Sequence, residues 1–370
     1  MKNYVLKTLK LNKEGYIIFL STIILSIIGI FMIYSSSNIW AEYLYNDKYY
    51  YLKRQIIFFI LGLGVIFISL KIDLNKIIKY IDIIELLGCL LLILVLIPGV
   101  GIERNGSRSW FGIGSLQFQP AELFKILSII YVAKHLGNNY YENKKLINLT
   151  SSLILPLVGF LLILIQPDFG SGIVMISAIV IMSLMSKIEF KNFIYLGLLG
   201  LGAIIIMIIS EPYRIERITA YIDPFSDPLG SGFQIIQSLY ALSPGGILGK
   251  GIDNSIQKHF YLPEPQTDFI FAIIAEEYGL IGSLLIIILF GILFYYGFSL
   301  ALKQKEYSKL LICVGIVSLI GVQVIINLGV VVGLLPVTGI TLPFISYGGS
   351  SLLILNIGIG LLLNLSRENI

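Results

Sequence analysis

Twenty-six consecutive residues without a charged side chain run from Leu310 to Leu335, with the sequence LLICVGIVSLIGVQVIINLGVVVGLL. The hydrocarbon core of a bilayer is about 30 Å thick, and an α-helix needs about 20 apolar residues to cross it. The stretch therefore predicts a transmembrane helix.

Nine further apolar segments predict an all-α polytopic membrane protein with about ten transmembrane helices. Residues 1–370 are expected to form a single integral membrane domain. The ten predicted spans are Tyr16–Ser35, Gln55–Leu70, Ile81–Ile97, Phe118–Ala133, Leu149–Ile165, Gly170–Ser186, Phe193–Ser210, Phe269–Ser299, Leu310–Leu335 and Ser350–Leu365. We expect the first span to be retained rather than cleaved as a signal peptide, because no clear small-x-small site follows it.

The composition supports the same class. Hydrophobic residues make up 56% of the 370 residues and charged residues 13%, against about 25% charged in soluble domains. This excludes a soluble globular enzyme. The net charge of +4 is spread along the chain, which argues against a nucleic-acid-binding surface.

Lysine and arginine predict the orientation, because short cytoplasmic loops carry the positive excess. Sixteen of these residues fall on the side of the N-terminus and nine on the opposite side, with Lys125 inside a span. Both termini are predicted to be cytoplasmic. The long polar loop of about residues 211–266, between the seventh and eighth spans, is predicted to be extracellular.

Smaller polar turns at Glu103–Gln117, Gln166–Gly170 and Pro336–Gly349 fall on the same outer face. The chain has no phosphate-binding or zinc motif of the GxxxxGK[ST], HExxH or GxGxxG type. No ATP is available at the outer face. An enzyme there must therefore use a substrate that is already activated.

Pro120 suits the first turn of the fourth span, which carries Glu122 and Lys125 on one helix face. Ionisable residues inside a span are costly and mark a functional site by default. The alternative is a structural ion pair that joins two helices. Gln119 and Arg108 lie just upstream on the same side, which favours function.

The eighth span begins near Thr267 and Asp268. Thr267 is predicted to be the N-cap, and Asp268 in the first turn would be stabilised by the helix dipole. Glu276 would lie about 12 Å deeper on nearly the same face. A functional carboxylate and an ordinary helix-start carboxylate both fit this pattern.

A glycine-rich turn, Ser346–Ser351, precedes the last span. Such a turn either lets the backbone approach a ligand or permits tight packing only.

Taken together, these motifs resemble the SEDS family of shape, elongation, division and sporulation proteins over essentially the whole chain. The likeness is to the division and sporulation branch, FtsW and SpoVE, and Gln266 stands where a His is common in the family. The motifs that carry it are Asn105–Trp110, Gln119–Lys125, Gln166–Gly170, Gly230–Ser238, Tyr261–Phe269 and Pro343–Ser350.

The resemblance implies a bacterial peptidoglycan glycosyltransferase with multiple spans in the cytoplasmic membrane. It would polymerise lipid II, an undecaprenyl-pyrophosphate-linked disaccharide pentapeptide, on the outer face during division or sporulation. The essential carboxylate maps to Asp268 and the sensitive pair to Glu122 and Lys125. The substrate-binding residues are predicted to be Arg108, Gln119, Glu122, Lys125, Glu264, Ser346 and Gly348.

In the expected inverting mechanism, Asp268 acts as general base on the acceptor 4-hydroxyl. Arg108, Lys125 or a divalent cation, Mg²⁺ or Mn²⁺, would stabilise the departing pyrophosphate. The alternative function is a lipid II flippase, although transporters often contain repeats and midplane sites, and the polar motifs here gather on one face.

The family also implies a partner, a class B penicillin-binding protein that cross-links the strands. The chain contains no SxxK and KTG set of its own, so the cross-linking nucleophile is expected to come from another polypeptide. We expect the partner to contact the long loop and lipid-facing small residues, which would allow close helix packing. The candidates are Gly279, Gly282, Ser283, Gly315 and Gly321.

Overall fold

Ten long helices dominate the computed structural model, which describes residues 11–104, 106–113, 116–138, 146–186, 188–209 and 212–367. Each predicted span coincides with one of these helices, so the prediction of a polytopic helical protein is confirmed. The helices are α2 (Lys13–Tyr45), α3 (Tyr50–Ser69), α4 (Leu74–Leu94), α5 (Pro120–Asn138), α6 (Leu146–Ile165), α7 (Phe169–Leu184), α8 (Phe190–Ile209), α11 (Ile270–Leu302), α12 (Tyr307–Val331) and α13 (Gly349–Arg367).

The described helices suit a membrane. Five of them, α2, α3, α11, α12 and α13, are long and apolar enough to cross one by length and composition alone. α7 is apolar but has 16 residues, and α4 and α5 each carry several charged residues. Large apolar side chains such as Ile57 and Ile60 on α3 are more than half exposed, as expected of a surface that faces lipid.

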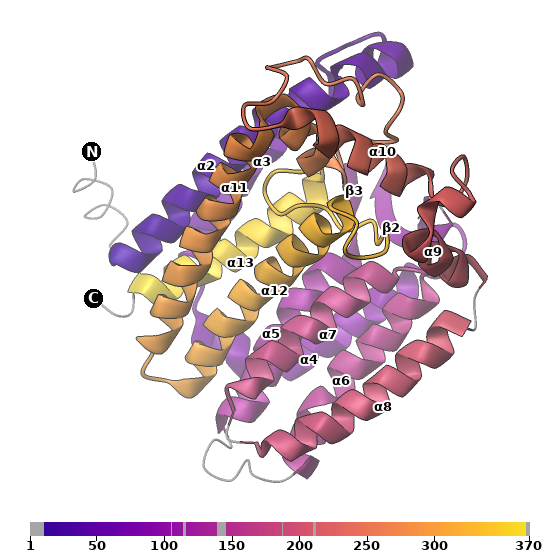
Figure 1. Cartoon of the computed structure of the whole chain (residues 1–370). Coiled ribbons are helices and arrows are strands. Elements are labelled where there is room, and N and C mark those ends of the chain that lie inside the picture. Colours follow the sequence, from indigo (N-terminus) through magenta and orange to yellow (C-terminus); the bar gives the residue numbers. More distant parts are fainter. Residues whose placement is uncertain are drawn as a thin grey trace.

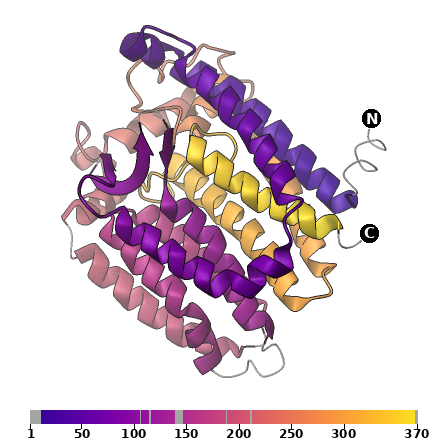
Figure 2. The same cartoon turned by 180° about the vertical axis from the view of Figure 1, so that it is seen from behind.

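The helices form one bundle around α12. This helix packs against α5, α7, α11 and α13, and most of its side chains are buried. α13 packs mainly against α3, and α11 against α2. Figure 1 shows α2 and α11 on one side of this centre and α4 to α8 on the other, and the view from behind agrees (Figure 2).

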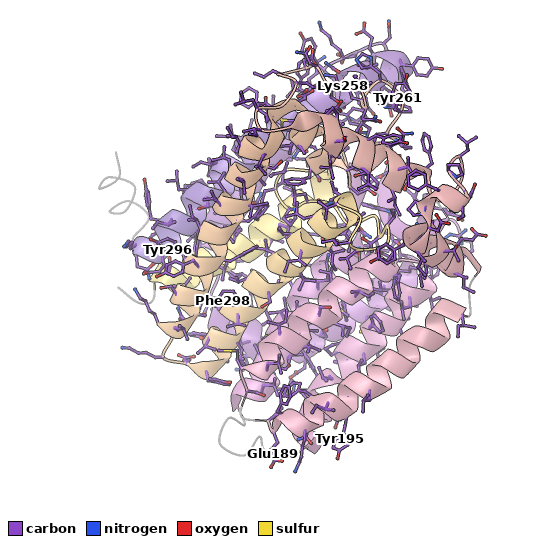
Figure 3. The ribbon with its side chains drawn as sticks, in the orientation of Figure 1. Glu189, Tyr195, Lys258, Tyr261, Tyr296 and Phe298 are labelled. Carbon is purple, nitrogen blue, oxygen red and sulfur yellow. The ribbon has the colours of Figure 1, made fainter. Side chains whose placement is uncertain are left out.

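The start of α2 and the end of α13 lie at the same end of the bundle (Figure 1). Lys303 at the end of α11 pairs there with Glu14 of α2 at 2.6 Å. The long loop covers the opposite end, where Lys258 and Tyr261 lie, far from Glu189 and Tyr195 (Figure 3). All the predicted polar turns therefore share one end, which we call the outer end.

The outer end contains helices and strands where the sequence predicts only turns and a loop. The Glu103–Gln117 turn belongs to an antiparallel sheet of β1 (Ile102–Arg104), β2 (Ser107–Ile113) and β3 (Leu116–Phe118) in the order β1-β2-β3. The long loop contains helices α9 (Pro212–Ile222) and α10 (Phe233–Leu242) and the 3₁₀ turns η1 (Pro224–Ser226) and η2 (Ser243–Gly245).

α11 is two helical segments joined at Gly279, which has a non-helical backbone (φ 62°, ψ −155°). The long loop bonds to both sides of this kink. The Lys250 N–H donates to Glu276 O at 2.9 Å, and the Leu280 N–H donates to Gly246 O at 2.9 Å. The short segment from Ile270 to the kink is therefore held by the outer loop.

Candidate active site

Three helices begin side by side at the outer end: α5, α7 and α13. Pro120 is the first residue of α5, where its missing N–H costs nothing. Asp168 is the N-cap of α7, and its Oδ1 accepts from the Ser171 N–H at 3.1 Å. These starts direct Glu122, Asp168 and Ser351 toward one another.

Glu122 and Lys125 form a buried ion pair. Lys125 Nζ lies 2.6 Å from Glu122 Oε1, and the two side chains are 2% and 9% exposed, respectively. Ser351 of α13 donates to Glu122 Oε2 at 3.3 Å. A buried charge needs such a partner, because desolvation of an unpaired ion costs several kcal/mol. The predicted pairing is therefore present, and both side chains are buried.

Asp168 belongs to the same cluster and was missed from the predicted site residues. Gln119 Nε2 donates to Asp168 Oδ2 at 2.6 Å. Burial raises the pKa of Asp168, and the Ser171 hydrogen bonds and the Lys125 charge oppose the rise. The signal was available, because the Gln166–Gly170 motif places a carboxylate at the start of a span.

The prediction that Thr267 caps the eighth span and that Asp268 lies in its first turn was wrong. α11 begins at Ile270, its N-cap is Phe269, and no side chain caps it, so Asp268 precedes the first turn. Thr267 Oγ1 instead lies 2.8 Å from Asp268 Oδ1 and 2.7 Å from Glu264 O.

Asp268 is half-buried, and its surroundings hold its pKa above the ordinary value for an aspartate. Burial raises its pKa; the Thr267 hydroxyl opposes the rise, exposed Glu264 adds to it and Arg217 on α9 opposes it. A carboxyl group with a raised pKa accepts a proton more readily than an ordinary aspartate, which is the property a general base requires.

The turn before α13 joins the ion pair to Asp268. Ser346 Oγ donates to Thr267 O at 2.5 Å, and Ser351 contacts Glu122 as described. Between them lies a hollow lined by Ser346, Gly348 and Ser351, with room for about one water molecule. Gly349 is the glycine that close packing requires, since a Cβ there would lie 2.4 Å from the ring of Phe58, whereas a Cβ at Gly348 would meet only Ser351 at 3.7 Å.

The contacts of Arg108 place it in the β-sheet, apart from this cluster. It is on β2, and its Nη2 pairs with Glu103 Oε2 of β1 at 3.0 Å. The neighbouring serines of the strand, Ser107 and Ser109, contact Gln166 O, so the sheet is held against the end of α6. A substrate contact by Arg108 stays a prediction.

A second buried charged network lies under the long loop. Glu276 is fully buried and accepts from Lys250 Nζ (3.1 Å), Ser255 Oγ (2.5 Å), and the N–H groups of Ile256 (2.9 Å) and Gln257 (3.3 Å). The carboxylate of Glu276 therefore holds the outer loop, and its depth relative to Asp268 stays a prediction.

Its neighbour Glu277 was missed altogether. Glu277 accepts from Ser35 of α2 at 2.7 Å and from Lys258 Nζ at 3.2 Å. Lys258 also contacts Asp253. Ser255 and Lys258 happen to have the SxxK spacing of transpeptidases, yet both are committed to these structural contacts.

The small residues proposed for a partner interface pack mostly within the protein. A Cβ at Gly279 would lie 2.4 Å from Gly249 N of the loop, and one at Gly315 would lie 2.4 Å from Ile129 of α5. Ser283 is buried and donates to Gly279 O. The smallness of Gly279 and Gly315 is explained by packing within the protein, whereas a Cβ at Gly321 would meet only Phe294 at 3.8 Å, so a partner contact at Gly282 or Gly321 stays a prediction.

Within the described ranges, no group of three or more His, Cys, Asp or Glu side chains is arranged to hold a metal ion. A divalent cation at the site stays a prediction.

Comparison with known proteins identifies relatives along the whole chain. The FtsW/RodA/SpoVE family model, described as "Cell cycle protein", matches residues 16–370. Stage V sporulation protein E of Bacillus subtilis is 46% identical over 365 residues, covering 97% of this chain and 99% of the relative. A probable peptidoglycan glycosyltransferase FtsW of Geobacter sulfurreducens is 38% identical over 368 residues, covering 99% and 98%.

Solved structures agree with the fold. A chain from a study titled "Structural coordination of polymerization and crosslinking by a peptidoglycan synthase complex" matches with a TM-score of 0.76 at 31% identity, covering 95% of this chain and 97% of that one. The rod shape determining protein RodA of Thermus thermophilus matches with a TM-score of 0.71 at 29% identity, covering 95% and 96%.

Proposed function

The chain belongs to the FtsW, RodA and SpoVE family of cell cycle proteins, and on that premise we propose that it is a peptidoglycan glycosyltransferase. It polymerises lipid II at the outer face of the bacterial cytoplasmic membrane. One observation carries the assignment to these residues: a half-buried carboxylate, Asp268, and a buried ion pair, Glu122 and Lys125, are linked through one turn at the outer end.

Asp268 serves as the general base. Its carboxylate takes the proton of the acceptor 4-hydroxyl on lipid II as the hydroxyl oxygen attacks the anomeric carbon of the growing strand. The bond from that carbon to the undecaprenyl pyrophosphate oxygen breaks, and its electron pair leaves with the pyrophosphate. Attack from the face opposite the leaving group inverts the anomeric carbon. The activated leaving group explains how polymerisation proceeds without ATP.

Lys125 stabilises the negative charge of the leaving pyrophosphate in this scheme. Glu122, which accepts a hydrogen bond from Ser351, holds Lys125 in place beside Asp168 and Gln119. Arg108 and a divalent cation are the competing assignments for this role, and separate substitutions distinguish them. Gln119, Glu264 and Gly348 remain proposed substrate contacts.

A membrane-anchored transpeptidase of the penicillin-binding class is the proposed partner. It would receive the uncrosslinked strand and dock on the exposed apolar side of α11 together with the long loop. Ile281, Leu285 and Ile288 lie on that side and are about half exposed. Lipid also covers such a surface, so substitution of these residues to bulkier side chains, followed by co-purification, separates the two occupants.

The test of the function is reconstitution of the purified protein in vesicles with lipid II, followed by separation of the products on a gel. We expect glycan polymer with release of undecaprenyl pyrophosphate. Movement of intact lipid II between leaflets, with no polymer formed, would identify a flippase instead.

A further inference from the structure

Three successive main-chain carbonyls that lead into α11 are each held by a donor from the C-terminal part of the chain. Gln266 O accepts from the Tyr347 N–H at 2.9 Å. Thr267 O accepts from Ser346 Oγ at 2.5 Å, and Asp268 O accepts from Asn327 Nδ2 at 2.7 Å. We call these three contacts the carbonyl clamp.

Asn327 lies near the outer end of α12 and is 1% exposed. Its Nδ2 donates to Ile340 O at 2.8 Å as well as to Asp268 O. One carboxamide therefore ties the Asp268 segment to both α12 and the loop that follows it. With both N–H groups bonded to the main chain, the side chain has no donor left for a ligand.

Ser346 is committed in the same way. Its hydroxyl accepts from the Leu342 N–H at 2.9 Å and donates to Thr267 O. The hydroxyl had been predicted to bind substrate, yet in this structure it shapes the turn and holds the Asp268 segment. The backbone here needs such support, because Asp268 precedes α11 and the helix has no side-chain cap.

We propose that Asn327 and Ser346 are positioning residues that hold the main chain of residues 266–268, so that the Asp268 carboxylate meets the acceptor hydroxyl. This inference rests on the proposed function. A reacting group must be held within about 0.5 Å of its productive position, and a misplacement of about 1 Å can cost about 100-fold in rate.

The test is steady-state polymerisation of lipid II by full-length Asn327→Leu and Ser346→Ala in vesicles. We expect kcat per folded molecule to fall about 10- to 100-fold while KM for lipid II stays unchanged. Ser346→Thr keeps the hydroxyl next to the hollow, so this variant should recover most of the rate.

Asn364→Leu is the matched control. Asn364 also donates to main-chain carbonyls, those of Ser69, Leu70 and Ile72, but it lies at the opposite end of the bundle. It should therefore lose stability without losing kcat per folded molecule. If Asn327→Leu fails to fold, the kcat values of Ser346→Ala and Ser346→Thr test the proposal on their own.

Wild-type kcat in both clamp variants would overturn the proposal, as would an equal loss in Asn364→Leu. A raised KM with unchanged kcat would also overturn it, because the side chains would then bind substrate directly. Absence of polymer with the wild-type protein is a different result, since it rejects the proposed function itself.

Discussion

Replacement of Gly279 by alanine should damage the protein more than the same change 12 residues further along α11. Gly279 has φ 62° and ψ −155°, a region that only glycine adopts readily. An added Cβ would also lie 2.4 Å from Gly249 N and 2.6 Å from Ile247 O. Backbone strain of about 1–3 kcal/mol and steric crowding of about 1–3 kcal/mol together predict about 2–6 kcal/mol of destabilisation.

Gly291→Ala is the internal control. Gly291 lies in the regular part of α11, and a Cβ there would meet nothing within 4 Å. Alanine in a helix interior is favoured over glycine by about 1 kcal/mol, so this variant should be as stable as the wild type or more stable.

Both cysteines, Cys89 and Cys313, are buried and form no disulfide, so they report unfolding through reaction with a fluorogenic maleimide during heating. Gly279→Ala should react at a lower temperature than the wild type, and Gly291→Ala should not. Equal midpoints for the two variants would refute the assignment of the kink as a glycine-dependent joint.

Three further outcomes follow from the buried charges. Glu276→Gln should destabilise the protein by about 2–4 kcal/mol, because a main-chain N–H left without an acceptor costs about 1–3 kcal/mol and Lys250 loses its counter-ion. The control is Glu42→Gln at an exposed position. Equal unfolding midpoints for the two variants would contradict this prediction. The pKa of Asp268 is higher in the folded than in the unfolded protein. Loss of its proton therefore lowers the free energy of unfolding as pH rises from the unfolded-state pKa to the folded-state pKa. The unfolding temperature of Asp268→Asn should therefore exceed that of the wild type by more at neutral pH than at low pH. A difference that does not depend on pH would argue against the raised pKa. Exchange of the ion pair as Glu122→Lys with Lys125→Glu should leave polymerisation lost in both single and double variants, whereas recovery in the double variant would indicate a purely structural pair.

The helices were predictable because a span must be apolar over its whole length, and a continuous segment of sequence is enough to test that requirement. The start of α5 at Pro120 and the pairing of Glu122 with Lys125 follow from local rules of the same kind, helix entry and i, i+3 spacing. These features needed no knowledge of distant residues.

The remaining features depend on contacts between distant parts of the chain. A capping rule predicted Thr267 as the N-cap, but Ser346 and Asn327 hold the backbone there and α11 starts later. Asp168 joins the site through Gln119, 49 residues away, and Arg108 pairs across a sheet that the loop composition did not reveal. Only the fold brings these partners together.

The most direct measurement of the central claim is the rate of glycan polymerisation by Asp268→Ala in vesicles supplied with lipid II. The control is Asp47→Ala, which removes a partly exposed carboxylate, paired with Lys53, from the turn between α2 and α3 at the same end of the bundle. Loss of a general base costs about 10²- to 10⁴-fold, so Asp268→Ala should lose that much activity while Asp47→Ala keeps the wild-type rate. Wild-type polymerisation by a folded, membrane-inserted Asp268→Ala protein would contradict the account.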